Sequence, residues 1–305
     1  DALAGVDACS MMNRAMEHFE ILQMNDKPNF FVSHCDIPYK VTDYTLDSYV
    51  RQMRRRVLEP LAEKYGVDTS DAAIRKAVAE HNEVCAIISE IGEMRKADNP
   101  VITGYEFHVL NLVSFTCPKQ LILPYLRETL EELKTRKPDA KPAFRARVAI
   151  VGSEIDDPNL TKLIESCGAL VVSDRYCFGS TPGREIIHLR DDEDALPQIC
   201  LHIMEHSECA RYISDEKVQQ RRDTADRLAR AFHADGIIYE QMKYCDYWGF
   251  ERALVSHIMH EEYNWPVLSI DRLYNNGNSG QLRTRVQAFV ESLEIKKLHK
   301  NGGAN

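Results

Sequence analysis

Residues Asp235–Trp248 read DGIIYEQMKYCDYW, and this stretch determines how the rest of the chain is interpreted. Its first half has the short apolar run of a buried strand, and it leads to the pair Cys245-Asp246. A second stretch, Asn29–Asp36 (NFFVSHCD), also closes an apolar run on a Cys-Asp pair. In open α/β sheets, ligands bind outside the carboxyl ends of the strands. The two stretches therefore predict two related units whose strand ends face one metal or redox site, with Cys35 and Cys245 beside it.

The composition limits the class of protein. A length of 305 residues predicts about two domains. No run of about 18 apolar residues occurs, so we expect no membrane span. The start of the chain lacks a basic region followed by an apolar run, so we expect no signal peptide and a cytoplasmic protein. A formal charge of -9 argues against nucleic acid as the main partner.

The pattern of strands and helices predicts an α/β fold. From residue 145 onward, short apolar runs alternate with amphipathic segments, which is typical of a parallel, doubly wound sheet. We predict three parts: residues 1–45 as a partial first α/β unit, 46–144 as a helical block, and 145–305 as a second α/β domain. In the helical block, we expect the last helix to begin near Pro124, since proline is tolerated in a first helical turn. The four expected strands of the second domain are Arg147–Gly152, Ala169–Ser173, Gly236–Tyr239 and Pro266–Ile270. Its expected helices include about Ala195–His206, a long helix capped by Ser214, and Phe250–Glu262, and we expect Pro138–Phe144 to be a linker.

The cysteines provide the main candidate site. There are nine, an odd number, and no CxxC pair occurs, which favours free thiols and metal ligands over a disulfide framework. Cys9 stands at the start of a predicted helix, where the helix N-terminus favours a thiolate. Together, Cys9, Cys35 and Cys245 could bind an iron–sulfur cluster and leave one iron open to a substrate. The alternative is that all three are buried structural cysteines. Cysteines with such long and irregular spacing are more often structural than ligands of a cluster.

Two further segments are weaker candidates. The glycine-rich loop Asn275–Gly280, followed by Arg283 and Arg285, fits either an anion site at a helix N-terminus or an ordinary strand-to-helix loop. Cys177 follows the second predicted strand of the second domain and is a further ligand candidate, more often structural than functional. The histidines show neither HxH nor HExxH spacing, so no histidine-based metal site is predicted.

Several segments together resemble the 2-hydroxyacyl-CoA dehydratase family, which also contains subunits of ATP-dependent benzoyl-CoA reductase. The resemblance rests on Cys35-Asp36 and on three segments of the second domain, and it is strongest from about residue 147 to 297. These segments are KYCDYWGFE (Lys243–Glu251), WPVLSID (Trp265–Asp271) and GQLRTRVQAFVESLE (Gly280–Glu294).

The resemblance implies a cofactor, a reaction and partners. It implies Rossmann-like or flavodoxin-like domains and a [4Fe-4S] cluster bound by three cysteines, which by position are Cys9, Cys35 and Cys245; some relatives also use flavin. It also implies a homologous second subunit that forms a heterodimer with this chain, and an ATP-hydrolysing activator protein that supplies one electron. The implied lyase reaction removes water from an (R)-2-hydroxyacyl-CoA through a ketyl radical and gives an enoyl-CoA. A reductase-type subunit and a non-catalytic electron-relay subunit are the alternatives, since three cysteines serve all of them.

The chain departs from the family pattern in two places. Family chains carry a substantial segment before the first cluster cysteine, whereas Cys9 lies almost at the start here. They also carry another strand and helix between the Cys-Asp pair and the helical block, but Tyr39-Lys40 runs directly into VTDYTLDSYV. We therefore expect either a shortened chain or a sequence that omits segments. Because some substrate-contacting residues of the family come from the leading segment, no catalytic acid or base is assigned.

Overall fold

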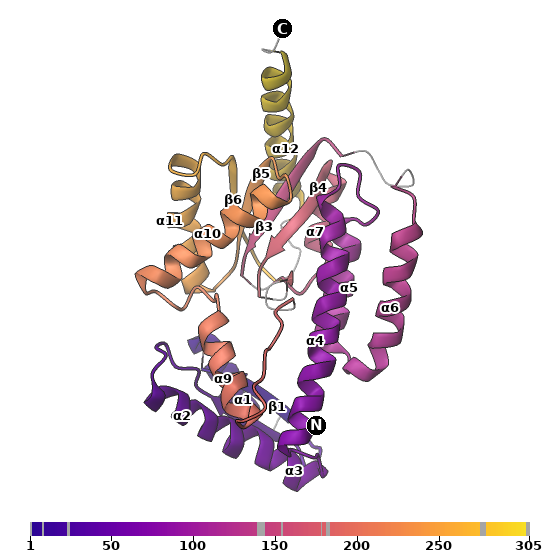
Figure 1. The fold of residues 1–305 in the computed structure, drawn as a ribbon. Coiled ribbons are helices and arrows are strands. Elements are labelled where there is room, and N and C mark those ends of the chain that lie inside the picture. Colours follow the sequence, from indigo (N-terminus) through magenta and orange to yellow (C-terminus); the bar gives the residue numbers. More distant parts are fainter. Residues whose placement is uncertain are drawn as a thin grey trace. The chain divides into compact units, whose positions relative to one another are not determined.

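The computed structural model describes residues 2–7, 9–22, 25–138, 144–153, 155–177, 179–180, 184–274 and 279–302. The chain divides into two compact units, each of which is described by itself (Figure 1). The first unit contains Asp1–Glu80 and Ile187–Ser207, and the second contains His81–Ile186 and Glu208–Asn305. Both units carry parallel sheets, so the predicted α/β class is confirmed. Within the described ranges, no helix has both the length and the apolar character needed to cross a bilayer.

The first unit is built on a strand–helix–strand motif. Strands β1 (Ala2–Val6) and β2 (Phe31–Cys35) pair in parallel, and helix α1 (Ser10–Ile21) connects them. Strand β1 was not predicted, because its residues ALAGV are small and include a glycine, which weakens the strand signal. That glycine has a packing role: a Cβ at Gly5 would come within 2.9 Å of the Met16 side chain on α1.

Helices complete the first unit. They are α2 (Asp43–Met53), the π-turn η1 (Arg54–Leu58), α3 (Glu59–Tyr65), the beginning of α4 (Asp71–Glu93) and, from much later in the chain, α9 (Ala195–His206). Tyr49 of α2 packs with Leu196, Cys200 and Met204 of α9 in one apolar cluster. Asp71 adds a polar contact, since its carboxylate accepts a hydrogen bond of 2.6 Å from the first backbone N–H of α9.

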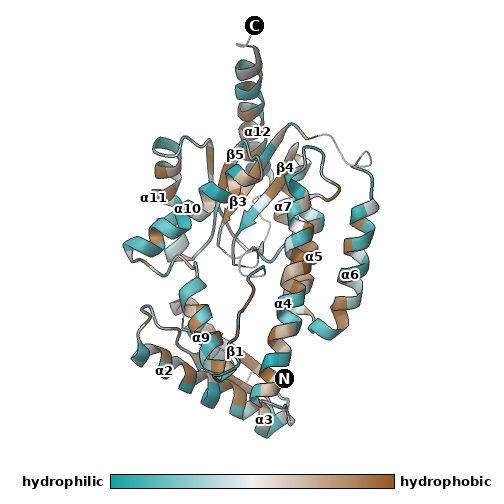
Figure 2. Cartoon of the chain, in the orientation of Figure 1, coloured by the Kyte–Doolittle hydropathy of each residue, from teal (hydrophilic) through white to brown (hydrophobic). Residues whose placement is uncertain are grey.

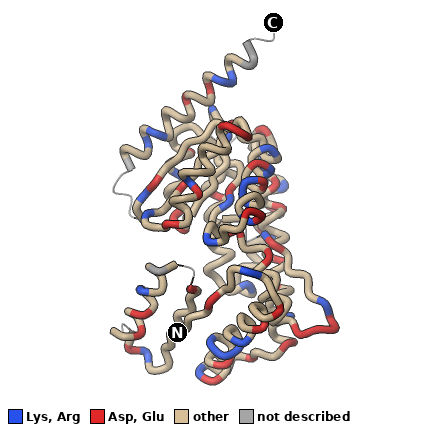
Figure 3. Tube along the Cα trace, turned by 90° about the vertical axis from the view of Figure 1, so that its left-hand side faces the viewer, with Lys and Arg blue, Asp and Glu red and all other residues tan. Residues whose placement is uncertain are grey.

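The second unit contains a four-stranded parallel sheet with the order β4-β3-β5-β6. These strands are β3 (Ala146–Gly152), β4 (Ala169–Arg175), β5 (Gly236–Met242) and β6 (Val267–Arg272). Figure 2 shows their apolar character against the mixed surfaces of the surrounding helices. Figure 3 shows Lys and Arg interspersed with Asp and Glu along the helices of both units. A sheet buried on both faces accounts for the nearly continuous apolar runs in the sequence.

The side chains of each strand alternate between the two faces of this sheet, which shows which helices cover each face. Val148 and Ile150 of β3 join a cluster with α7 (Asn159–Ser166) and α12 (Ser279–Gly302). Their neighbours Ala149 and Val151 join a different cluster with α10 (Asp215–Ala231) and α11 (Asp246–Glu261). Because successive side chains of a strand point to opposite faces, the two clusters lie on opposite sides of the sheet.

A helical layer adjoins the sheet in the second unit. It consists of the remainder of α4, the short 3₁₀ turn η2 (Met94–Lys96), α5 (Gly104–Thr116) and α6 (Lys119–Thr135). The predicted start of the last helix near Pro124 is wrong, because α6 begins at Lys119 and includes that proline. Helix α5 was not predicted either. Its sequence GYEFHVLNLVSFT is apolar on most sides, so it lacks the polar face that makes a helix recognisable.

Two predicted boundaries near the candidate site differ from the structure. Strand β5 extends to Met242, beyond the predicted end at Tyr239, and α11 begins at Asp246, before the predicted start at Phe250. Both changes shorten the connection around Cys245 to a tight turn. The segment proposed as a linker after Pro138 lies mostly outside the described residues.

Candidate functional site

Cys9 and Cys35 lie at the carboxyl ends of the two paired strands in the first unit. Cys35 is the last residue of β2 and stands opposite Val6, the last residue of β1. The Asp7 N–H donates a hydrogen bond of 3.0 Å to the Cys35 carbonyl, which keeps the two strand ends together. Cys9 follows β1 closely and is the N-cap residue of α1. The parallel pairing therefore places both cysteines at the same edge of this sheet.

Cys245 occupies a matching local position in the second unit. Its N–H donates a hydrogen bond of 2.9 Å to the carbonyl of Met242, the last residue of β5, and closes the turn. Cys245 is then the N-cap residue of α11, and its carbonyl accepts a hydrogen bond of 2.9 Å from the Gly249 N–H. Gln241 also donates its side-chain N–H to this carbonyl at 3.0 Å. The backbone of the turn is thus held by three hydrogen bonds.

The two N-cap cysteines share their local geometry. Cys9 has φ -149° and ψ 132°, and Cys245 has φ -75° and ψ 104°, both in the extended region. Neither side chain forms a capping hydrogen bond to its helix, and both residues are partly exposed. The N-terminus of an α-helix carries a partial positive charge that favours an anionic side chain. Each position is therefore suited to a thiolate that acts as a ligand.

Cys35 differs from the other two because it is buried, with 3% of its surface exposed. Burial raises the pKa of its thiol, while a hydrogen bond with Ser33 and the charge of Arg56 act in the opposite direction. The strand end is fixed by two hydrogen bonds to η1. Ser33 Oγ donates to the Arg56 carbonyl, and Arg56 Nη1 donates to the His34 carbonyl, each at 2.5 Å.

A buried polar network fixes the strand that leads to Cys245. Glu240 of β5 is fully buried, and its Oε1 lies 2.7 Å from Arg272 Nε at the end of β6. The Ser153 N–H and Oγ–H donate to Glu240 Oε2 at 3.2 Å and 2.9 Å. The Met242 N–H donates to Ser153 Oγ at 2.6 Å. Burial raises the pKa of Glu240, although Arg272 and Ser153 oppose this change. The carboxyl ends of β3, β5 and β6 are thereby joined.

A second buried ion pair lies at the end of β4. Arg95 Nη2 lies 2.9 Å from Asp174 Oδ1, and the Arg95 guanidinium stacks over the Phe107 ring at 3.7 Å. Burial alone would raise the pKa of Asp174, but Arg95 holds it below its ordinary value. The Ser180 N–H donates to Asp174 Oδ2 at 2.6 Å. Asp174 therefore connects Arg95 of the helical layer to Ser180, which lies three residues after Cys177.

Neither of these two buried ion pairs was predicted from the sequence. The available signal was the presence of charged residues in or beside strands that are otherwise apolar. Glu240 follows GIIY, Asp174 follows ALVVS, and Arg272 follows VLSID. A charge in such a run is seldom fully buried without a partner. The partners could not be assigned, because Arg95 and Arg272 come from distant parts of the chain.

The remaining candidates have different outcomes. Cys177 is partly exposed just beyond β4, and its N–H donates to the Ser153 carbonyl at 3.3 Å. Most of the predicted loop Asn275–Gly280 lies outside the described residues. Arg283 donates to Ser166 Oγ at 2.9 Å and Arg285 donates to the Ser269 carbonyl, so both guanidinium groups have partners within the fold.

The other cysteines support a structural role for most of the thiols. None of the nine cysteines forms a disulfide bond. Cys85, Cys167 and Cys200 are buried. Burial raises the pKa of Cys85 to about 11 and that of Cys200 to about 12. Within each unit taken alone, the described residues contain no group of three His, Cys, Asp or Glu side chains arranged to hold a metal ion.

Comparison with known proteins identifies relatives of this chain. Residues 1–293 match the family model described as "2-hydroxyglutaryl-CoA dehydratase, D-component". A curated relative is the "Putative dehydratase subunit YjiM" of Escherichia coli (strain K12), with 23% identity over 268 residues. The alignment covers 84% of this chain and 67% of the relative. The family match includes all three candidate cysteines.

Proposed function

This chain belongs to the 2-hydroxyglutaryl-CoA dehydratase D-component family, and from that premise we propose that it is an iron–sulfur subunit of a 2-hydroxyacyl-CoA dehydratase. The reaction would be elimination of water from a 2-hydroxyacyl-CoA to give an enoyl-CoA. The observation that carries the proposal is the equivalence of Cys9 and Cys245, each of which follows a parallel strand and starts a helix. We propose Cys9, Cys35 and Cys245 as ligands of one [4Fe-4S] cluster.

The donor set fits such a cluster chemically. Thiolates are the usual ligands of iron–sulfur clusters, and three of them leave one iron for another ligand. Two of the proposed ligands stand at helix N-termini, where the thiolate is stabilised. When bound, the cluster would supply a Lewis-acidic iron and one low-potential electron. Two alternatives remain: the thiols are structural, or the subunit only relays electrons. Each predicts a different result when substrate turnover is measured.

The residues around the ligands have a positioning role in this proposal. Ser33 and Arg56 fix the end of β2, where Cys35 lies. The buried Glu240–Arg272 pair and Ser153 fix the end of β5, which precedes the turn to Cys245. A ligand geometry that must accept and release an electron benefits from such rigid support, since little reorganisation is then needed.

We also propose partners for this subunit. The family description names a component of a dehydratase, so a second dehydratase subunit is expected in the complex. An activator iron–sulfur protein that hydrolyses ATP would supply the electron, and an acyl-CoA would be the substrate. Assays with a series of 2-hydroxyacyl-CoA thioesters would identify the acyl chain of the substrate.

The ligand proposal is tested by measuring iron in matched variants. Anaerobically purified wild-type protein should contain about four irons per chain and show the broad visible absorption of an iron–sulfur cluster. Cys245→Ser should lose most of this iron. Cys209→Ser is the matched control, since Cys209 is also partly exposed and belongs to the same unit. Equal iron in the wild type and in Cys245→Ser would refute the assignment.

The functional proposal needs a separate measurement. The subunit is co-expressed with its partner, supplied with the activator and ATP, and assayed for enoyl-CoA formation from 2-hydroxyacyl-CoA thioesters. A complex that retains its iron and accepts electrons but forms no enoyl-CoA from any thioester would favour the electron-relay alternative. Turnover that survives complete loss of iron would contradict a role for the cluster in the reaction.

A further inference from the structure

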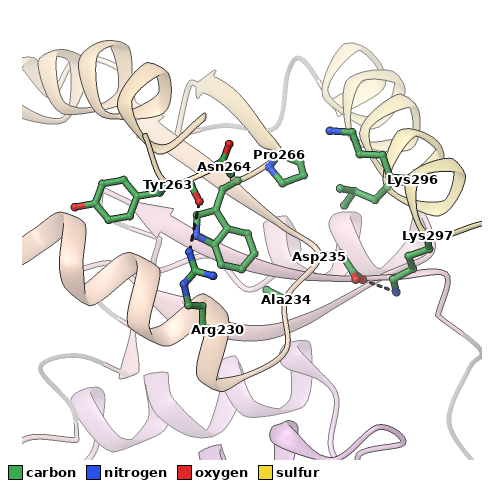
Figure 4. A pocket seen from close by; sticks show the side chains of 10 residues that line it. Arg230, Ala234, Asp235, Tyr263, Asn264, Pro266, Lys296 and Lys297 are labelled. Atoms are coloured by element: carbon green, nitrogen blue, oxygen red, sulfur yellow. Dashed lines mark hydrogen bonds and ion pairs between the residues drawn. The ribbon is translucent and has the colours of Figure 1, made fainter. Parts of the chain in front are cut away.

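A pocket lies at the amino-terminal edge of the sheet in the second unit, away from the turn that contains Cys245. Its volume is about 650 Å³. Asp235 directly precedes β5 and Pro266 directly precedes β6, whereas Cys245 follows the carboxyl end of β5. We call this hollow the amino-edge pocket (Figure 4). Its charged and aromatic lining consists of Arg230, Asp235, Tyr263, Trp265, Lys296 and Lys297.

In one wall of the amino-edge pocket, the Arg230 guanidinium lies over the Trp265 ring. The guanidinium carbon lies 5.1 Å from the indole centroid. Asp226 binds both side chains: its Oδ1 accepts the indole N–H at 2.7 Å, and both oxygens accept Arg230 Nε at 2.9 Å. Because the carboxylate fixes both groups, the planar guanidinium is preorganised at the pocket wall. Such a plane can stack on another flat group and also donate to an anion.

The opposite wall carries two cations of α12. Figure 4 shows Lys296 and Lys297 on this helix, across the pocket from Arg230. Lys297 forms an ion pair with Asp235, and Asp226 balances the charge of Arg230. Lys296 has no ion pair with any residue that the structure describes. The side chains around the pocket therefore leave one positive charge uncompensated.

Two helices end beside the pocket, and some of the carbonyls in their last turns already accept hydrogen bonds. The last turns of α10 and α11 point toward it, and helix C-termini carry a partial negative charge. In α10, the Ala229 carbonyl accepts a hydrogen bond of 2.9 Å from the Ala234 N–H. In α11, the Met259 carbonyl accepts one of 2.9 Å from the Trp265 N–H. These bonds occupy carbonyls that would otherwise repel an anion.

We propose that the amino-edge pocket binds a small organic anion composed of a flat ring and a phosphate group. Lys296 contacts the phosphate, and the ring packs against the Arg230 guanidinium, which lies over Trp265. A volume of about 650 Å³ is within the range of roughly 300–1,000 Å³ that small-molecule sites occupy. This binding is independent of the proposed cluster, because it involves none of the candidate cysteines.

Adenosine 5′-monophosphate is a suitable probe because it carries both parts of the proposed ligand. Its binding to the full chain is measured by calorimetry and by the fluorescence of Trp265. Adenosine and inorganic phosphate test each part alone, and each should bind at least about tenfold more weakly than the monophosphate. Trp248 is the other tryptophan and lies outside the pocket lining, so Trp265→Phe should abolish the fluorescence change; because Trp265 supports Arg230, the same variant should also bind the monophosphate more weakly by calorimetry.

Two substitutions and one control test the residues. Lys296→Gln and Arg230→Gln should each weaken binding of the monophosphate roughly three- to tenfold, the range of a partly exposed charged contact. Lys137→Gln is the control, since Lys137 is exposed and lies outside the pocket lining. Absence of saturable binding, or equal affinity in the wild type and Lys296→Gln, would overturn the proposal. Inorganic phosphate binding as tightly as the monophosphate would overturn the stacking contact.

Discussion

Replacing Arg272 with methionine should destabilise the second unit strongly, and by an amount that depends on pH. Arg272 Nε lies 2.7 Å from Glu240 Oε1, and both side chains are buried. Removing one partner of a buried pair leaves an uncompensated charge and typically costs about 3–5 kcal/mol. Ser153 still donates to Glu240 Oε2, which places the expected loss toward the lower end of that range.

The pH dependence follows from the carboxyl group. The pKa of Glu240 is already raised above the ordinary value of 4.5 by burial, and loss of Arg272 should raise it further. A carboxyl with a raised folded-state pKa is stabilising while protonated, and that stability is lost as pH rises through the folded pKa. The variant should therefore lose less unfolding free energy at about pH 5.5 than at about pH 8. This loss should change by at most about 1.4 kcal/mol per pH unit.

Urea unfolding of the variant at both pH values measures these differences. The double variant Glu240→Gln with Arg272→Met is the control, because it removes both charges and should recover much of the stability. A loss below about 1 kcal/mol at pH 8 would show that Glu240 does not require its partner. A loss of the same size at both pH values would show that the unpaired carboxylate is not its cause.

Three further outcomes are expected. Cys85 and Cys200 should react with a thiol reagent much more slowly than Cys209, because burial raises their pKa to about 11 and about 12; equal rates measured by mass spectrometry would contradict this. Thr103→Ala should cost about 1 kcal/mol in urea unfolding, because Thr103 and Glu106 form the capping box of α5; an unchanged stability would disagree with the cap. Under the proposed function, air should bleach the visible absorbance and abolish turnover on similar timescales, and activity that outlasts the absorbance would count against the cluster.

The local parts of the fold were predictable from particular residues. Ala195–His206 is helical over the range expected from its periodicity, and Ser214 caps α10 as predicted. The strands of the second unit were located because buried parallel strands form continuous apolar runs. The predictions failed where the local signal was weak. The small residues of β1 resemble a loop, and the apolar sides of α5 hide its helical period.

At the candidate site, too, local features were predictable and contacts between distant segments were not. The sequence indicated that Cys9 begins a helix and that Cys35 ends a strand, and the structure confirms both. It placed Cys245 some residues before a helix, whereas the structure makes it the N-cap residue of α11. The pairing of β1 with β2, which brings Cys9 and Cys35 to one sheet edge, required a strand that the sequence did not reveal. The joint role of the three cysteines stays a prediction.

Sequence alone determined the α/β class, most helices and strands, and the family to which the chain belongs. These properties depend on neighbouring residues, because hydrophobic periodicity and capping act over a few positions of the chain. Tertiary structure alone decided the strand order β4-β3-β5-β6, the buried Glu240–Arg272 and Arg95–Asp174 pairs, and the walls of the amino-edge pocket. Each of these joins residues that are distant in the chain. Their partners are selected by burial and hydrogen bonding in the packed protein, which no local pattern encodes.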